Sequence, residues 1–155
     1  MPDNKQEMNI QWYPGHMTKT RRMIQSQLKN MDAVCEILDA RIPISSRNPD
    51  VEELTAGKPR LVVLNRIDIA DSDATRTWAA WFRSKGFAVL EVNAKDGQGT
   101  ARFAAAVREL LADKLAAYAE KGQVGRTVRV MIFGIPNVGK STFINKVAKR
   151  KTAKA

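Results

Sequence analysis

The sequence contains one cysteine, no long apolar run and no secretion signal at its start. Cys35 has no partner for an internal disulfide, which excludes a disulfide scaffold and favours a small apolar side chain in a reducing compartment. No stretch approaches the roughly 18 consecutive apolar residues of a membrane-spanning helix. Residues 1–7 have neither the basic nor the apolar region of a signal peptide. We therefore predict a cytoplasmic protein with no membrane partner.

Acidic residues are missing from the last part of the chain. Residues 121–155 carry nine Lys and Arg and no Asp or Glu, whereas residues 31–120 are slightly acidic and the whole chain is at +10. Such a concentration of positive charge predicts a polyanionic partner, either nucleic acid or the phosphates of a nucleotide. The 155 residues, 44% of them hydrophobic, suffice for one packed core, which excludes a disordered tail or a collagenous repeat.

Four short apolar runs alternate with segments of helical periodicity. The runs, which we interpret as buried strands, are residues 32–38, 61–64, 88–92 and 128–133. The helical segments are residues 18–31, 48–56, 73–85, 101–121 and 140–149. This alternation predicts right-handed crossovers and a mainly parallel sheet. We expect an α/β domain over residues 32–155, with residues 1–31 as an N-terminal helical extension.

A phosphate-binding loop is predicted directly after the fourth run. Residues 134–141, Gly-Ile-Pro-Asn-Val-Gly-Lys-Ser, fit the G-x-x-x-x-G-K-[ST] pattern between a strand and a helix. The glycines allow backbone N–H groups to surround a phosphate at the positive end of the helix. Lys140 can reach the β- and γ-phosphates, and the hydroxyl of Ser141 can ligate Mg²⁺. The predicted binding residues of this loop are Asn137, Val138, Gly139, Lys140, Ser141 and Thr142.

Two further elements follow the second and third runs, and each resembles a guanine-recognition element of GTPases. Residues 65–68, Asn-Arg-Ile-Asp, resemble N-K-x-D, in which the carboxylate of Asp68 can accept from N1–H and the N2 amine of guanine. Asn65 can link this loop to the phosphate loop, and Arg66 stands where lysine is usual. Residues 93–95 (Asn93, Ala94 and Lys95) resemble S-A-K, in which the backbone N–H of Ala94 would meet guanine O6. Ligands bind at this edge of open α/β sheets.

The order of these elements narrows the resemblance. The base-recognition elements precede the phosphate loop, as in circularly permuted GTPases. Residues 120–126 would be the segment that joins the original N- and C-termini of the unpermuted domain. Residues 12–17 (Trp-Tyr-Pro-Gly-His-Met) and 38–43 (Leu-Asp-Ala-Arg-Ile-Pro) resemble signatures of the YlqF/RbgA family of ribosome-biogenesis GTPases. The resemblance covers about residues 9 to 150, and it implies a three-layer, P-loop GTPase-like domain that is circularly permuted.

The resemblance also implies a function. It implies GTP and GDP as ligands with Mg²⁺, GTP hydrolysis, action in assembly of the large ribosomal subunit, binding to rRNA, and a monomer off the ribosome. Because the family lacks the usual catalytic glutamine, His16 becomes a candidate catalytic residue, although it could also merely cap the following helix. Asp-x-x-Gly and a switch threonine would follow the phosphate-loop helix in such a protein, so we expect the chain to be truncated and to hydrolyse GTP poorly.

The sequence is also compatible with other interpretations. The chain could be an rRNA-binding module with vestigial nucleotide binding, or an ATP-using P-loop kinase, which Asp68 and the motif order disfavour. Residues 96–99 match Asp-x-x-Gly but are interpreted as a turn before a helix. Trp78 and Trp81 are better explained by packing than by RNA stacking, and residues 39–41 by an ion pair that stabilises a turn. The basic run at residues 146–154 fits either a solvated helix end or an RNA contact.

Overall fold

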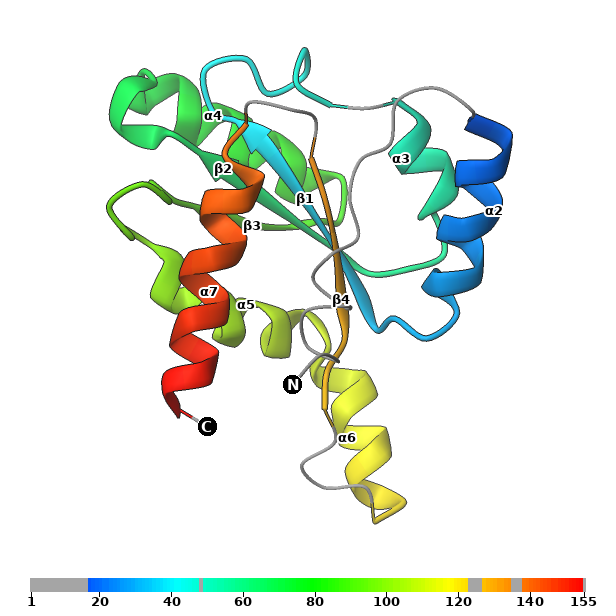
Figure 1. The fold of residues 1–155 in the computed structure, drawn as a ribbon. Coiled ribbons are helices and arrows are strands. Elements are labelled where there is room, and N and C mark those ends of the chain that lie inside the picture. The colour runs from blue at the N-terminus through cyan, green and yellow to red at the C-terminus, as the bar shows by residue number, and fades with distance from the viewer. Residues whose placement is uncertain (1–16, 48, 123–126, 135–137, 155) are drawn as a thin grey trace.

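A computed structural model describes residues 17–47, 49–122, 127–134 and 138–154 of the chain. Helices and strands alternate through most of these ranges, as predicted (Figure 1). The helices are α2 (Met17–Leu28), α3 (Pro49–Leu54), α4 (Ser72–Ser84), α5 (Phe103–Leu110), α6 (Ala112–Glu120) and α7 (Lys140–Lys154). The strands are β1 (Ala33–Asp39), β2 (Arg60–Asn65), β3 (Ala88–Glu91) and β4 (Val130–Phe133). Two 3-10 turns, η1 (Ile67–Ile69) and η2 (Thr100–Arg102), complete the order.

The four strands form one parallel sheet in the order β3-β2-β1-β4. The register pairs Asp39 with Asn65 at the ends of β1 and β2, and Glu36 with Phe133 between β1 and β4. All residues of β1 and β2 are buried, which is why their sequences are nearly continuous apolar runs. Parallel strands bring all their carboxyl ends to one edge of the sheet. In Figure 1 this edge lies at the top, where β1 ends and α7 begins.

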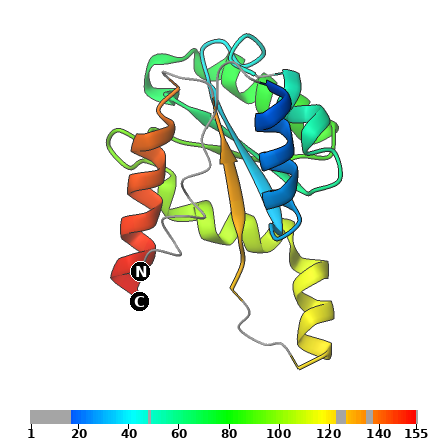
Figure 2. The same cartoon turned by 45° about the vertical axis from the view of Figure 1, so that its right-hand side comes forward.

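Helices cover both faces of the sheet, so the fold has three layers (Figures 1 and 2). On one face α5 and α7 pack against Ile37, Val63 and Ile132. On the other, α4 packs against β2, and α2 buries Ile24 and Leu28 against β1 and β4. The predicted three-layer α/β fold with an N-terminal helix is confirmed. Within the described ranges, no helix is both long and apolar enough to cross a membrane.

One predicted helix is divided in the structure. The segment 101–121 consists of η2, α5 and α6, and the break falls at Leu111 (φ −102°, ψ 15°). Leu111 is buried in the core, whereas α6 contains no buried residue and extends away from the sheet in both views (Figures 1 and 2). The single helix was predicted because the apolar spacing continues through the break. Sequence spacing does not show where a helix leaves the sheet.

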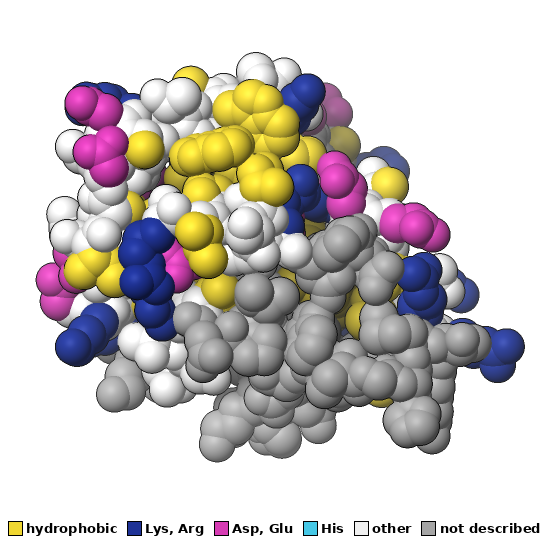
Figure 3. All heavy atoms as spheres, turned by 90° about the horizontal axis from the view of Figure 1, so that it is seen from above, with side chains coloured by type: hydrophobic (Ala, Val, Ile, Leu, Met, Phe, Trp, Pro, Cys, Tyr) yellow, Lys and Arg dark blue, Asp and Glu magenta, His cyan; other side chains and the backbone are white. Residues whose placement is uncertain are grey.

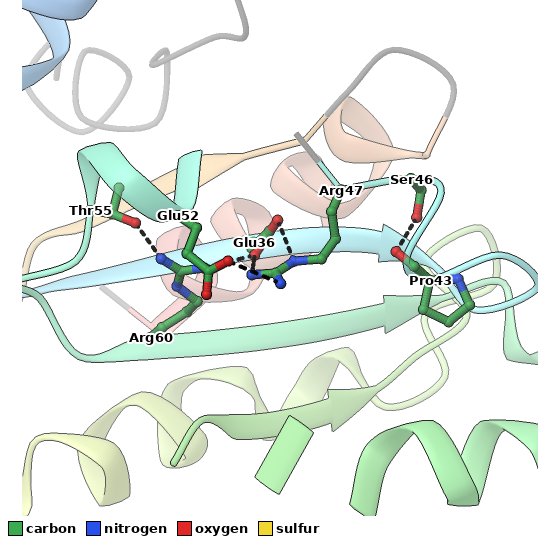
Figure 4. A network of polar contacts seen from close by, with 7 residues as sticks. All are labelled: Glu36, Pro43, Ser46, Arg47, Glu52, Thr55 and Arg60. Carbon is green, nitrogen blue, oxygen red and sulfur yellow. Dashed lines mark hydrogen bonds and ion pairs between the residues drawn. The ribbon is translucent and has the colours of Figure 1, made fainter. Parts of the chain in front are cut away.

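A buried polar network interrupts the apolar face beneath α3 and α4. Glu36, in the middle of β1, accepts from Arg47 (Nη2–Oε1 3.1 Å) and from Arg60 (Nη1–Oε1 3.1 Å), as Figure 4 shows. Arg60 also donates to the hydroxyl of Thr55, and Glu52 reaches Arg47 from the exposed side. Buried Arg60 and half-buried Arg47, whose side chain is 14% exposed, therefore share one buried carboxylate. This arrangement ties the start of β2 and the segment before α3 to the centre of the sheet.

We expect the Glu36→Ala variant to lose about 3–5 kcal/mol of unfolding free energy, because the buried charge of Arg60 and the half-buried charge of Arg47 would lose their shared anion. The matched control is Glu52→Ala, which removes a carboxylate that is 57% exposed and should cost less than about 1 kcal/mol. Urea denaturation of both variants measures the difference. Equal losses would contradict the assigned role of Glu36.

Candidate functional site

The three predicted nucleotide elements all lie at the carboxyl edge of the sheet. Asn65 is the last residue of β2, residues 93–95 follow β3, and the phosphate loop follows β4. Helix α2 also begins at this end of the molecule, at the top of Figures 1 and 2. Seen from above, hydrophobic side chains gather over part of this face and basic side chains lie near its rim (Figure 3). The parallel strands thus bring together segments that are far apart in the sequence.

The side chain of Asn65 joins all three elements. Its Nδ2 donates to the carbonyl oxygen of Val138 in the phosphate loop (2.7 Å), and its Oδ1 accepts from the backbone N–H of Ala94 (2.9 Å). All three residues are buried. The amide is oriented by these partners, since one is an acceptor and the other a donor. The predicted link between Asn65 and the phosphate loop is therefore confirmed.

The glycines of the phosphate loop leave space for neighbouring side chains. Gly139 has φ +88°, and a Cβ there would lie 2.3 Å from Nδ2 of Asn65. A Cβ on Gly134 would lie 3.1 Å from Val138 Cγ2 and 3.5 Å from the Cδ of Lys140. The aliphatic part of Lys140 therefore passes over Gly134. Burial lowers the pKa of Lys140, because the desolvated ammonium lacks a compensating anion among the described residues.

The loop after β3 is a tight turn. The backbone N–H of Asn93 donates to the carbonyl oxygen of Gln98 (2.9 Å), and the N–H of Gly97 donates to the carbonyl oxygen of Asn93 (2.9 Å). Gly99 has φ +83°, and a Cβ there would lie 2.4 Å from the carbonyl oxygen of Glu91. The interpretation of residues 96–99 as a turn before a helix is confirmed, and Lys95 at its tip is exposed.

The backbone N–H of Ala94 has a partner within the protein, because it donates to Oδ1 of Asn65. That this N–H meets guanine O6 stays a prediction. A contact with O6 would have to share or replace that bond. Spacing in the sequence places Ala94 at the correct edge but cannot show that an asparagine from another strand reaches it first.

The segment after β2 carries the exposed carboxylate of Asp68. Arg66 has φ 68°, the left-handed conformation, and it starts the 3-10 turn that contains Asp68. The side chain of Asp68 is exposed. The N–H of Ile67 donates to the carbonyl oxygen of Val92 (3.3 Å), which fixes this turn to the end of β3. The geometry leaves Asp68 accessible to a ligand at the sheet edge.

Residues 39–41 form the predicted ion pair. Arg41 donates from Nε to Asp39 Oδ1 (3.0 Å) and from Nη2 to Oδ2 (2.7 Å), and its own backbone N–H also donates to Oδ1 (2.9 Å). These bonds to Arg41, with further help from its charge and that of Arg66, lower the pKa of Asp39. Sequence reasoning missed Ser46, whose buried hydroxyl accepts from Asp39 N–H and donates to the carbonyl of Pro43. No motif marks such a serine.

The hydroxyl of Ser141 is the candidate ligand for a magnesium ion at this site. Ser141 and Thr142 are exposed in the first turn of α7, directly after Lys140. Across the part of the chain that the structure describes, no group of His, Cys, Asp and Glu could hold a metal by itself. A single hydroxyl fits Mg²⁺ that takes its other ligands from nucleotide phosphates and water.

Other predicted residues have varied positions. His16 and Asn137 lie outside the described residues, as do the side chains of the basic run after Ala148. Trp78 packs with Phe82 on α4, as the packing interpretation predicts, whereas Trp81 is 38% exposed beneath Lys85. Cys35 is buried, and burial raises the pKa of its thiol, so it is an apolar core residue and not a reactive group.

Together, these features define a P-loop domain of the GTPase class in which the two elements predicted to recognise the base precede the phosphate loop in the sequence. A sequence profile described as "50S ribosome-binding GTPase" matches residues 129–155. The chain is 50% identical over 147 residues to "Ribosome biogenesis GTPase A" of Bacillus cereus, covering 95% of this chain and 50% of that protein. It is 37% identical to "Mitochondrial ribosome-associated GTPase 1" of Mus musculus, covering 93% of this chain and 44% of that protein.

Solved structures agree with the sequence comparison. The structure resembles that of GNP-bound YlqF from T. maritima with a TM-score of 0.58 and 32% identity, covering 83% of this chain and 47% of that one. A GDP-bound structure of the same protein gives a TM-score of 0.58 and 31% identity, covering 83% of this chain and 48% of that one. The chain is thus homologous over nearly its whole length to the ribosome biogenesis GTPase A (YlqF/RbgA) family. It spans about half the length of the curated relatives that it matches.

We expect Gly139→Ala to lose about 1–3 kcal/mol of unfolding free energy, because the new methyl group would both strain a left-handed backbone and displace the Asn65 amide. The control is Gly57→Ala, where nothing lies within 4 Å of the added Cβ and the change should stay within about 0.5 kcal/mol. Denaturant unfolding compares the two. A Gly139 variant as stable as the Gly57 variant would show that the amide does not need this space.

Proposed function

We propose that this chain is the guanine-nucleotide-binding part of a GTPase that acts in assembly of the large ribosomal subunit. The observation that carries the proposal is the Asn65 amide, which holds the phosphate loop and the loop after β3 in one unit. A purely structural strand-to-helix turn has no need of this link. The structures of YlqF from T. maritima with GNP and with GDP bound support the same ligand class.

Guanine selectivity would depend mainly on Asp68. An exposed carboxylate accepts hydrogen bonds but cannot donate them, so it fits the N1–H and N2 amine of guanine and finds no matching donors on adenine. Asn65, Asn93 and Lys95 would shape the rest of the base site, and the stem of Arg66 would cover the ring. The N–H of Ala94 would bind O6 only by sharing its bond to Asn65.

Phosphate binding would depend on residues 137–142. Lys140 would supply positive charge to the phosphates, and its burial cost would be offset once an anion is bound. Ser141 would hold Mg²⁺, which neutralises phosphate charge when bound, and Thr142 would follow it in the same turn. His16 remains the candidate for orienting the attacking water. For these 155 residues we propose binding with little hydrolysis, because no Asp-x-x-Gly segment follows the phosphate-loop helix within them.

The proposed partners are the large ribosomal subunit and its rRNA. We propose that the protein acts in the cytoplasm and is a monomer when it is not bound to the ribosome. The similarity to a ribosome biogenesis GTPase and to a mitochondrial ribosome-associated GTPase supports ribosome association. Two properties of the chain fit a large partner. Ile42 and Ile44, which follow β1, and Ile69, at the end of η1, are each about half exposed, and the last 35 residues are strongly basic.

The central test is a calorimetric titration of the chain with GDP and ADP. We expect GDP to bind much more tightly than ADP. The Asp68→Asn variant should lower the affinity for GDP by about 10- to 100-fold, because charge-assisted hydrogen bonds to the base are lost. The same variant should favour xanthosine diphosphate, whose C2 oxygen accepts from an amide. The control is Asp73→Asn, an exposed carboxylate on α4. Equal affinity for GDP and ADP would contradict guanine selectivity and favour an ATP-using kinase. If neither nucleotide binds, the nucleotide site is vestigial.

Partner binding is tested by cosedimentation with large ribosomal subunits at increasing salt. We expect binding to weaken steeply, because contacts between the basic C-terminal part and RNA phosphates release counterions. Binding that does not respond to salt would contradict an electrostatic rRNA contact.

A further inference from the structure

We propose that Asp39 is a positioning residue for base recognition: with Arg41 it holds the turn that presents Asp68 in the geometry that guanine requires. This inference rests on the proposed function, since it assigns a role within the same guanine site. Neither residue needs to touch the nucleotide. They act from the neighbouring strand, through the backbone of the Asn65–Asp68 turn.

The first step is the backbone contact between the two strand ends. Asp39 and Asn65 are register partners at the ends of β1 and β2, and Ala40 N–H donates to the carbonyl oxygen of Asn65 (2.8 Å). The turn that leads to Asp68 starts at this carbonyl. Its direction therefore depends on where the segment after Asp39 places the Ala40 N–H.

The second step is the rigidity of the segment after β1. Asp39 accepts three hydrogen bonds from Arg41, and its own N–H donates to Ser46 (3.0 Å). At the far end Arg47 is bonded to Glu36 in the middle of β1, so both ends of this segment are fixed to the same strand (Figure 4). The segment thus has little freedom to move away from the base-recognition turn.

The third step is apolar contact with that turn. Ala40 belongs to the same buried cluster as Leu64, and Ile67 packs against that cluster. Ile67 immediately precedes Asp68. Hydrogen bonds, packing and the nearby positive charge of Arg66 therefore all connect the Asp39 segment to the residues on either side of the turn. A turn-stabilising pair in a loop without function would not need these contacts to the second strand.

The test compares GDP with inosine diphosphate, which lacks the N2 amine, by calorimetry on the full chain. We expect Asp39→Asn to reduce the GDP-to-IDP affinity ratio by about 3- to 10-fold, mostly through weaker GDP binding, because Asp68 would no longer be held for the amine. Arg41→Gln should act in the same direction. Arg41 is 45% exposed, so this variant folds even if the buried Asp39 variant does not.

The matched control is Asp32→Asn at the opposite end of β1. Asp32 is also buried, also accepts a backbone N–H, that of Arg129 (2.9 Å), and also pairs with a cation, Lys114 (3.2 Å). The Asp32→Asn variant should lower the stability of the fold without changing the ratio of GDP affinity to IDP affinity. A ratio unchanged in both Asp39→Asn and Arg41→Gln, or reduced equally in Asp32→Asn, would overturn the inference. A parent chain that binds GDP and IDP equally would instead overturn the proposed function of Asp68 itself.

Discussion

The amide of Asn65 is the constraint on which the site depends. It is buried at the end of a central strand, where each of its polar atoms must find a partner, and the partners come from two different loops. The phosphate loop must keep Gly139 because a larger residue would occupy the place of the amide. These two buried hydrogen bonds thereby fix the distance between the two halves of the proposed nucleotide site.

The sheet makes this constraint possible. Parallel strands buried on both faces bring every following loop to one edge, so residues 65, 94 and 138 meet although the chain connects them through three α-helices and two 3-10 turns. The permuted order of the motifs does not alter this geometry, since the register of the strands sets the positions of the loops. The pair of Asp39 and Arg41 belongs to the same edge, between the base-recognition and phosphate elements.

Much of this arrangement could be predicted from the sequence. The apolar runs located all four strands, and the spacing of Gly134, Gly139 and Lys140 located the phosphate loop. What could not be predicted depends on contacts between distant segments. Helical periodicity did not reveal the break at Leu111, and the motif did not reveal that Ala94 N–H serves Asn65. The Glu36 network gave only one sequence signal, a carboxylate inside an apolar run.

The central claim is that loops from three strands form one guanine-nucleotide site, and NMR amide shifts during a GDP titration test it most directly. The account predicts simultaneous shifts at Ala94 and Asp68 in the base-recognition loops and at Gly139 and Lys140 in the phosphate loop, all following one binding curve. Shifts confined to the phosphate loop would contradict it, because they would mean that the base is not recognised.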